Sequence, residues 1–124
     1  LTTAMSYARI YSEGEASFLR TLTIPVSAIT YIEDSPHPTR NISDCLSRNM
    51  KSCSFPLTQS ATTSAVKNVV ESRGSQYLQF KKWFCPSNVC SATKIGYNIY
   101  RDNSHISVPT ALALVVQFSA FIKP

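Results

Sequence analysis

The stretch VSAITYI, residues 26–32, is the part of the sequence that indicates the fold class. Its apolar residues form a near-continuous run, which is typical of a strand buried on both faces of a parallel sheet. Pro25 stops the preceding segment from continuing as a helix, and the sequence EDSP at 33–36 ends the strand, because acidic residues and proline interrupt sheet pairing. We therefore expect a buried parallel strand at 26–32.

Segments with the apolar spacing of a helix lie on both sides of this strand. Residues 3–22 place their apolar side chains on one helix face, and residues 59–73 do the same before Gly74 ends the segment. A third helix is expected at 108–122. It is apolar nearly all round, so it should be substantially buried.

A second strand is expected at 78–84, where apolar and aromatic side chains alternate, and Cys85-Pro86 ends it. A short extended run follows at 97–100. The order helix, strand, helix, strand, helix predicts an α/β layer with a parallel sheet and right-handed crossovers. A length of 124 residues suits one domain, so we expect residues 1–124 to form a single domain.

The composition is that of a folded protein with a mild excess of positive charge. Hydrophobic residues make up 44% of the sequence and charged residues 15%, which excludes a disordered chain. Twelve Lys and Arg against seven Asp and Glu give a formal net charge of +5, but Lys81-Lys82 is the only adjacent basic pair. A protein that binds nucleic acid normally clusters its cations, so we expect no nucleic-acid partner.

The four cysteines stand in two close pairs, Cys45 with Cys53 and Cys85 with Cys90. Their spacings do not fit the short knuckles of zinc sites, and both histidines lie far from such a pattern. Each pair brackets a loop rich in Ser and Asn, so we expect two local disulfides and an oxidising, extracytoplasmic compartment. Metal ligation and free buried thiols are the alternatives, and four cysteines allow three pairings.

One segment carries residues suited to acid–base chemistry, YRDNSHIS at 100–107. An Asp three residues before a His in a turn can fold its carboxylate onto the imidazole Nδ1. That contact fixes the tautomer and leaves Nε2 free to take a proton from a nucleophile. The same spacing also occurs in turns without any chemical role. Asp102 and His105 are therefore candidates for either a catalytic pair or an ordinary surface turn.

The stretch 78–107 resembles the C-terminal part of SGNH-type serine hydrolase domains, in particular the version fused behind bacterial membrane acyltransferases of the acyltransferase-3 family. The resemblance is carried by FCP at 84–86 with Cys90, by YRDNSHIS at 100–107 ahead of a helix, and upstream by IEDSP at 32–36 and CLS at 45–47. It implies a flavodoxin-like three-layer sandwich with disulfide-stapled loops. It also implies that Asp102 and His105 are the acid and base of a Ser-His-Asp triad.

The sequence departs from that family in its nucleophile. The family's serine lies in a Gly-Asp-Ser motif near the start of the domain, and this sequence has no Gly-Asp-Ser. The Gly and Asn that complete the oxyanion hole have no counterpart here either. Because the chain begins with Leu1 inside an expected helix, we expect it to be the C-terminal portion of a larger SGNH domain.

The function implied by the resemblance is part of an extracytoplasmic O-acyl, specifically O-acetyl, transferase or esterase that acts on cell-envelope carbohydrate. Its partners would be a carbohydrate or acyl-ester substrate, the rest of the SGNH domain and an N-terminal membrane acyltransferase domain, with no cofactor and no metal. The alternative is a non-catalytic, secreted, disulfide-stabilised binding module. A Gly-Asp-Ser upstream of Leu1 would favour the enzyme.

Overall fold

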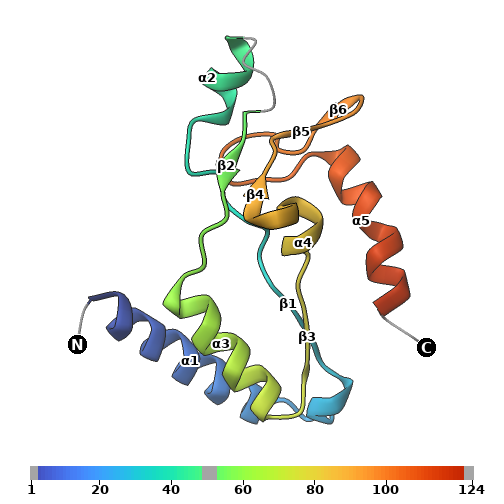
Figure 1. The fold of residues 1–124 in the computed structure, drawn as a ribbon. Helices are drawn as coiled ribbons and strands as arrows, with labels where there is room; N and C mark the ends of the chain where they lie inside the picture. Colours follow the sequence, from blue (N-terminus) through green and yellow to red (C-terminus); the bar gives the residue numbers. More distant parts are fainter. Residues whose placement is uncertain (1–2, 49–52, 122–124) are drawn as a thin grey trace. The chain divides into compact units, whose positions relative to one another are not determined.

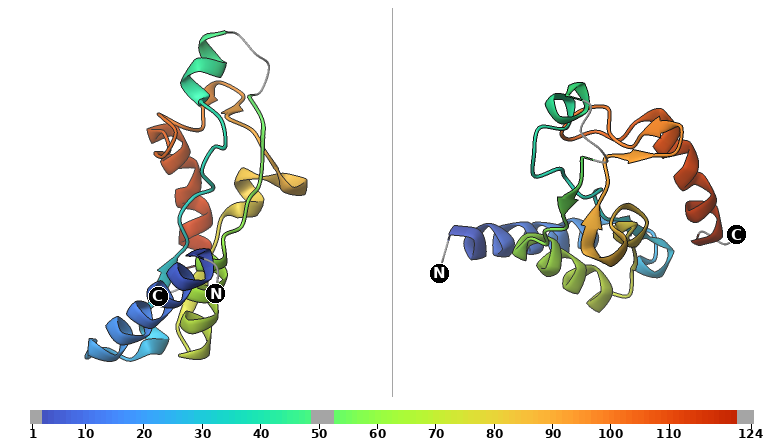
Figure 2. Two further views of the ribbon diagram at one scale, coloured as in Figure 1. Left: turned by 90° about the vertical axis from the view of Figure 1, so that its left-hand side faces the viewer. Right: turned by 45° about the horizontal axis from the view of Figure 1, so that its top comes forward.

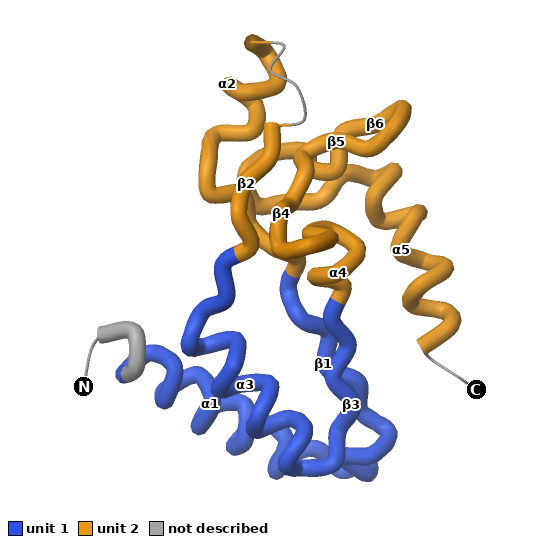
Figure 3. Tube along the Cα trace, viewed as in Figure 1, with its two compact units in different colours: residues 1–34, 58–79 blue, residues 35–57, 80–124 orange. Residues whose placement is uncertain are grey.

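The computed structural model describes residues 3–48 and 53–121. The chain divides into two compact units, which are coloured separately in Figure 3. Unit 1 consists of residues 1–34 and 58–79, and unit 2 consists of residues 35–57 and 80–124. Both units mix helices with short strands, so the protein is of the mixed α/β class.

Unit 1 combines two long helices with a two-stranded parallel sheet (Figure 1). Helix α1 (Thr3–Thr21) packs along helix α3 (Ala61–Ser72), and the two helices lie side by side in every view of Figures 1 and 2. Strand β1 (Thr30–Ile32) pairs in parallel with strand β3 (Gln76–Leu78). Among the described residues, this is where the expected parallel pairing is found.

Helix α3 has the boundaries that its capping residues dictate. The Ser60 hydroxyl accepts a hydrogen bond from the Thr63 backbone N–H at 3.1 Å, which satisfies a free donor of the first turn. The chain leaves the helix at Gly74, whose φ of +86° is accessible to glycine at little cost. Val66 and Val70, four residues apart, provide the buried face.

A tyrosine pair ties the two parallel strands together. The rings of Tyr31 and Tyr77, which are register partners, stack with centroids 5.3 Å apart. The Tyr77 hydroxyl donates a hydrogen bond to Glu33 Oε1 at 2.6 Å. Burial, together with this bond to a carboxylate, raises the pKa of Tyr77 above its ordinary value. The pair therefore holds the register of the sheet through uncharged phenol rings.

The strand expected at 26–32 is shorter and more exposed than predicted. Val26–Ala28 form a 3-10 turn, in which a backbone N–H bonds back to the Pro25 carbonyl at 2.9 Å, and the strand covers only Thr30–Ile32. This 3-10 turn uses backbone N–H and C=O groups that a longer strand would need for pairing with its neighbour. Ile32 is 48% exposed, so the expectation of burial on both faces is wrong.

Unit 2 is built from short elements and contains both disulfides. Its helical elements are α2 (Ile42–Ser47), α4 (Lys81–Phe84), the 3-10 turn η2 (Pro86–Asn88) and α5 (Val108–Phe121). Its strands form two antiparallel pairs, β2 (Phe55–Pro56) with β4 (Val89–Cys90) and β5 (Thr93–Lys94) with β6 (Tyr97–Asn98).

The core of unit 2 is a cluster of buried apolar and cysteine side chains: Ile42, Cys45, Cys53, Phe55, Phe84, Cys85, Cys90, Ala92, Ile99, Tyr100 and Leu114. The disulfides join Cys45 to Cys53 and Cys85 to Cys90, which are the nearest-neighbour pairs expected from the spacing. Covalent cross-links inside a small core reduce the conformational entropy of the unfolded chain. They compensate for the shortness of the strands in this unit.

The strand expected at 78–84 is wrong beyond Leu78. The next residues turn into helix α4, in which the Phe84 N–H bonds to the Phe80 carbonyl at 3.2 Å and the Trp83 N–H bonds to the same oxygen at 2.8 Å. Phe80, Trp83 and Phe84 have the i, i+3, i+4 spacing of one helix face, and all three pack in or against the core. Core packing has overridden the strand preference of aromatic residues.

Helix α5 lies where the sequence predicts it, but its expected burial is wrong. Only Thr110 and Leu114 are buried among its described residues. The large apolar side chains of the opposite face are exposed by 73% at Val108, 66% at Leu112, 53% at Val115 and 71% at Val116. The last residue of the expected helix, 122, lies outside the described residues. In the described ranges, no helix has both the length and the hydropathy needed to span a bilayer.

Candidate active site

The segment 100–107 forms a closed turn directly ahead of helix α5. Tyr100 and Ile106 face each other in an isolated antiparallel bridge, and the Arg101 N–H donates to the His105 carbonyl at 2.9 Å. These contacts close the base of the turn, so the residues between them are held at its tip.

The Asp102 carboxylate contacts the His105 imidazole within this turn. Nδ1 of His105 lies 2.9 Å from Oδ1 and 2.9 Å from Oδ2 of Asp102. A neutral imidazole that donates Nδ1–H to this carboxylate keeps its lone pair on Nε2, where a proton can be accepted. The His105 side chain is 62% exposed, so the ring is accessible to a reacting group.

The backbone of the same turn fixes Asp102. Its Oδ1 accepts the N–H of Ser104 at 2.9 Å and the N–H of His105 at 2.8 Å, as in an Asx turn. The Ser104 N–H, followed by the His105 side chain, holds the pKa of Asp102 well below its ordinary value. The carboxylate is therefore ionised at neutral pH and can stabilise a protonated imidazole.

Two neighbouring side chains contact this pair without being placed as reactive groups. The Ser104 Oγ lies 3.4 Å from Nδ1 of His105, the nitrogen that already faces Asp102. Ser104 is therefore not positioned as a nucleophile activated through Nε2. The Arg101 Nε lies 3.6 Å from Asp102 Oδ2, and a salt bridge this exposed contributes little to stability.

The stem of the turn is anchored in the core of unit 2. The hydroxyl of buried Tyr100 donates to the Pro36 carbonyl at 2.7 Å, and burial raises the pKa of Tyr100. At the start of α5, the hydroxyl of Thr110 donates to the Ile99 carbonyl at 2.8 Å. The Ser107 hydroxyl donates to the Asn98 carbonyl at 2.6 Å. Both sides of the turn therefore lead into fixed structure.

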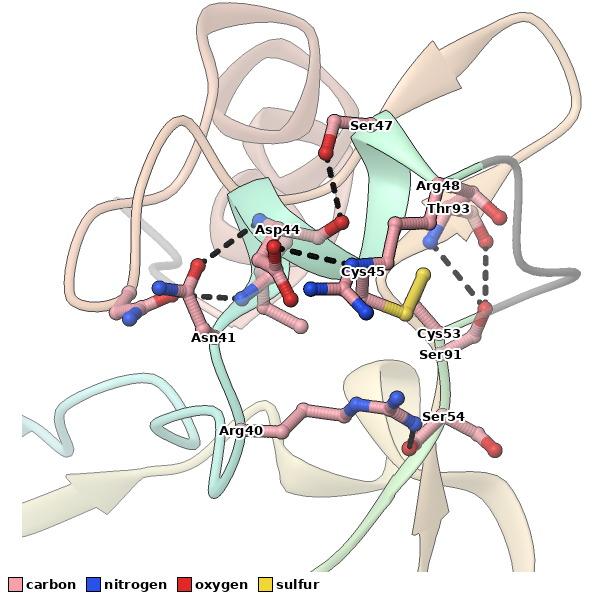
Figure 4. Close-up of a disulfide and its surroundings, with 12 residues drawn as sticks. Arg40, Asn41, Asp44, Cys45, Ser47, Arg48, Cys53, Ser54, Ser91 and Thr93 are labelled. Carbon is pink, nitrogen blue, oxygen red and sulfur yellow. Dashed lines mark hydrogen bonds and ion pairs between the residues drawn. A yellow bond between two sulfur atoms is a disulfide. The ribbon is translucent and has the colours of Figure 1, made fainter.

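The tip of the turn is also attached to a distant part of the chain. Oδ1 of Asn103 accepts a hydrogen bond from the backbone N–H of Ile42 at 2.9 Å. Ile42 is the first residue of α2, the helix that carries Cys45 of the first disulfide, whose surroundings are shown in Figure 4. The sequence pattern does not single out Asn103 or Ser104. Asp, Asn and Ser in succession signal a turn, but nothing in them identifies a partner 61 positions away.

The described residues offer no grouping of three or more His, Cys, Asp and Glu side chains that could hold a metal ion. All four cysteines are engaged in disulfides, so none is a free thiol. The contact of His105 Nδ1 with the Asp102 carboxylate is an arrangement that can support proton transfer at His105.

Comparison with known proteins identifies the family. A family model described as "SGNH domain (fused to AT3 domains)" matches residues 4–120, which is nearly the whole chain. No curated protein and no solved structure gives a significant match to the chain. On the strength of the family match, the chain belongs to this family of SGNH domains.

Proposed function

We propose that the chain is the C-terminal part of a larger SGNH domain and supplies the Asp and His of a Ser-His-Asp triad for O-acyl transfer or ester hydrolysis. The observation that carries this proposal is the contact of His105 Nδ1 with the Asp102 carboxylate at 2.9 Å. Membership of an SGNH family whose description includes fusion to AT3 domains supports a module associated with acyl transfer or esterase activity.

In this mechanism, a serine outside the chain attacks the carbonyl carbon of an ester. Nε2 of His105 takes the serine proton as the new C–O bond forms, and Asp102 stabilises the resulting imidazolium. When the tetrahedral intermediate collapses, the bond to the alkoxide breaks and His105 returns the proton to that oxygen. A sugar hydroxyl or water then attacks the acyl-enzyme, and His105 takes its proton. The bond to the serine oxygen breaks, and His105 returns the proton to the serine, which gives transfer or hydrolysis.

The nucleophile and the oxyanion hole are assigned to the remainder of the larger domain. The absence of Gly-Asp-Ser from the sequence supports this assignment. In a flavodoxin-like sandwich, β1 and β3 would be two strands of a longer parallel sheet. The 48% exposure of Ile32 agrees with that arrangement, because parallel sheets are normally covered on both faces.

The disulfides support an extracytoplasmic location, because such bonds form and persist in oxidising compartments. The AT3 fusion in the description of the family supports an N-terminal membrane acyltransferase domain as the covalent partner. We propose acetyl groups on cell-envelope carbohydrate as the substrate, with the membrane domain as the source of the acyl group.

An ester assay with the full-length protein tests this proposal through Asp102→Asn. The variant should lower the turnover of p-nitrophenyl acetate by on the order of 10³- to 10⁴-fold, because an amide cannot hold the required tautomer or stabilise the imidazolium. Asp44→Asn is the matched control, since Asp44 is also exposed and lies in α2 of the same unit. Undiminished turnover by a folded Asp102→Asn variant would contradict the proposal and favour the non-catalytic binding module.

A further inference from the structure

We propose that Asn103 is a positioning residue that attaches the Asp102–His105 turn to helix α2, and that the Cys45–Cys53 disulfide supports catalysis by holding α2 in place. The inference deepens the proposed function and rests on it for its catalytic part.

The tip of the turn depends on a single hydrogen bond for its link to the rest of the unit. Asn103 Oδ1 accepts the Ile42 N–H at 2.9 Å. For residues 102–105 of the described structure, the other hydrogen bonds stay within the turn itself. Asn103 and its neighbours in the turn are exposed or only partly buried, so packing alone holds them weakly.

The donor of this bond is fixed much more firmly than the acceptor. The Ile42 side chain is only 1% exposed and belongs to the core of unit 2. Its N–H is one of the N-terminal amides of α2 that have no partner inside the helix. The Asn41 side chain caps a different amide, the Asp44 N–H, at 2.9 Å. The Ile42 N–H is thus left for Asn103, which connects the turn to a residue buried in the core of unit 2.

The disulfide is what keeps α2 in this position. A helix of six residues is too short to be stable by itself, so its geometry must come from its surroundings. Cys45 in α2 is bonded to Cys53, and both are almost completely buried. Arg40 Nη1 also donates to the Ser54 carbonyl at 3.3 Å, as drawn in Figure 4. Helix α2 is therefore held covalently at Cys45, and the chain just before it is held by the hydrogen bond of Arg40.

Such an attachment matters because proton transfer depends steeply on geometry. A displacement of about 1 Å at a catalytic group can lower a rate on the order of 10²-fold. Without the attachment, Asp102 and His105 would still meet inside their own turn, but the turn as a whole could shift relative to the serine and substrate. The loss should therefore appear in kcat, with KM nearly unchanged.

The test compares Asn103→Ala with Asn103→Asp in the full-length protein. Aspartate retains an oxygen that can accept the Ile42 N–H, whereas alanine does not. Asn68→Ala is the matched control, because Asn68 is an exposed asparagine of α3 and takes no part in the turn. Asn103→Ala should lower kcat by about 10- to 100-fold with KM within about twofold of wild type. Asn103→Asp should recover most of this loss, and Asn68→Ala should resemble wild type.

Hydrogen–deuterium exchange followed by mass spectrometry supplies a readout that does not depend on catalysis. Peptides covering 102–107 should exchange faster in Asn103→Ala than in wild type, and Asn103→Asp should restore their protection. Removing the disulfide with Cys45→Ala and Cys53→Ala should also speed exchange in this peptide. The effect should be small when Asn103→Ala is already present, because the two changes act through one attachment. If the double-cysteine variant does not fold, the comparison of Asn103→Ala with Asn103→Asp tests the attachment without it.

Different results would overturn the attachment through Asn103 and the proposed catalytic function. Unchanged exchange at 102–107 in Asn103→Ala overturns the attachment, whatever happens to turnover. Faster exchange with kcat at the wild-type level overturns the role of Asn103 in positioning. Faster exchange combined with turnover that does not respond to His105→Ala supports the attachment but overturns the proposed catalytic function.

Discussion

Nδ1 of His105 lies 2.9 Å from each of the two carboxylate oxygens of Asp102, in a turn whose own N–H groups hold that carboxylate in place. The contact is built from residues only three positions apart, so it does not require the rest of the domain to form. In the proposed function, catalysis would require the rest of the domain, because the serine that reaches Nε2 is assigned to a segment outside the chain. The pair would then be a preassembled part of the proposed site.

Asp102 should titrate at a pH well below its ordinary pKa of 3.8. Because the folded pKa is lowered, the ionised carboxylate stabilises the folded protein at pH values above 3.8, and this contribution is lost as the pH falls through the folded pKa. Asp102 therefore stays charged throughout any assay near neutral pH. Carbon-13 NMR of labelled aspartate carboxyl groups measures this titration directly.

The same titration in His105→Ala separates the causes of the shift. The Ser104 N–H is the largest cause of the lowering and the His105 N–H adds to it, so part of the lowering should survive when the imidazole is removed. An ordinary Asp102 pKa in the wild-type protein would contradict the Asx-turn geometry.

Peptide mapping without reduction should recover Cys45 linked to Cys53 and Cys85 linked to Cys90. Replacing Cys45 and Cys53 by alanine should lower the free energy of unfolding by about 2–3 kcal/mol, as chain-entropy estimates give for a loop this short. A denaturant titration beside the wild type measures the loss. Free thiols, or a crossed pair such as Cys45 with Cys85, would contradict the structure.

The exposed face of α5 should tolerate charge. Leu112→Glu combined with Val116→Lys places an ion pair at i, i+4 and should change the free energy of unfolding by no more than about 0.5 kcal/mol. Because exposed apolar patches promote association, sedimentation velocity of the 124-residue chain should show less self-association in this variant. Leu114→Glu is the control, since Leu114 is only 8% exposed and a charge there should destabilise the fold strongly. If the double variant destabilised the fold as much as Leu114→Glu, the α5 face that carries Leu112 and Val116 would also be packed.

The elements that the sequence predicts well are those governed by local signals. Helix α3 begins after Ser60 and ends before Gly74, since a capping hydroxyl and a glycine at positive φ act over a few residues. The first strand and the region after Leu78 are less predictable. The first strand is shortened by the 3-10 turn at Val26–Ala28. After Leu78, the apolar residues fit two periodicities, and packing of Phe84 in the core of unit 2 favours the helix.

The candidate site also has one part that local sequence predicts and another part that it does not. The spacing of Asp102 and His105 predicts their contact, because three residues in a turn bring both side chains to one side. The bond between Asn103 and Ile42 depends on how α2 folds, 61 positions earlier in the chain, and no local pattern encodes it. The exposed face of α5 could not be predicted either, since an apolar sequence does not say how much of its surface the neighbouring elements cover.

The most direct test of the central claim is the turnover of an ester substrate by the full-length protein carrying His105→Ala, measured beside His37→Ala. The chain has only these two histidines, both are exposed, and the structure places the His105 imidazole against Asp102, so His37→Ala controls for the loss of an imidazole. We expect His105→Ala to lower kcat by on the order of 10³-fold or more and His37→Ala to leave it near the wild-type value, with circular dichroism showing both folded. Equal turnover by the wild type and both variants would contradict a catalytic role for the Asp102–His105 pair.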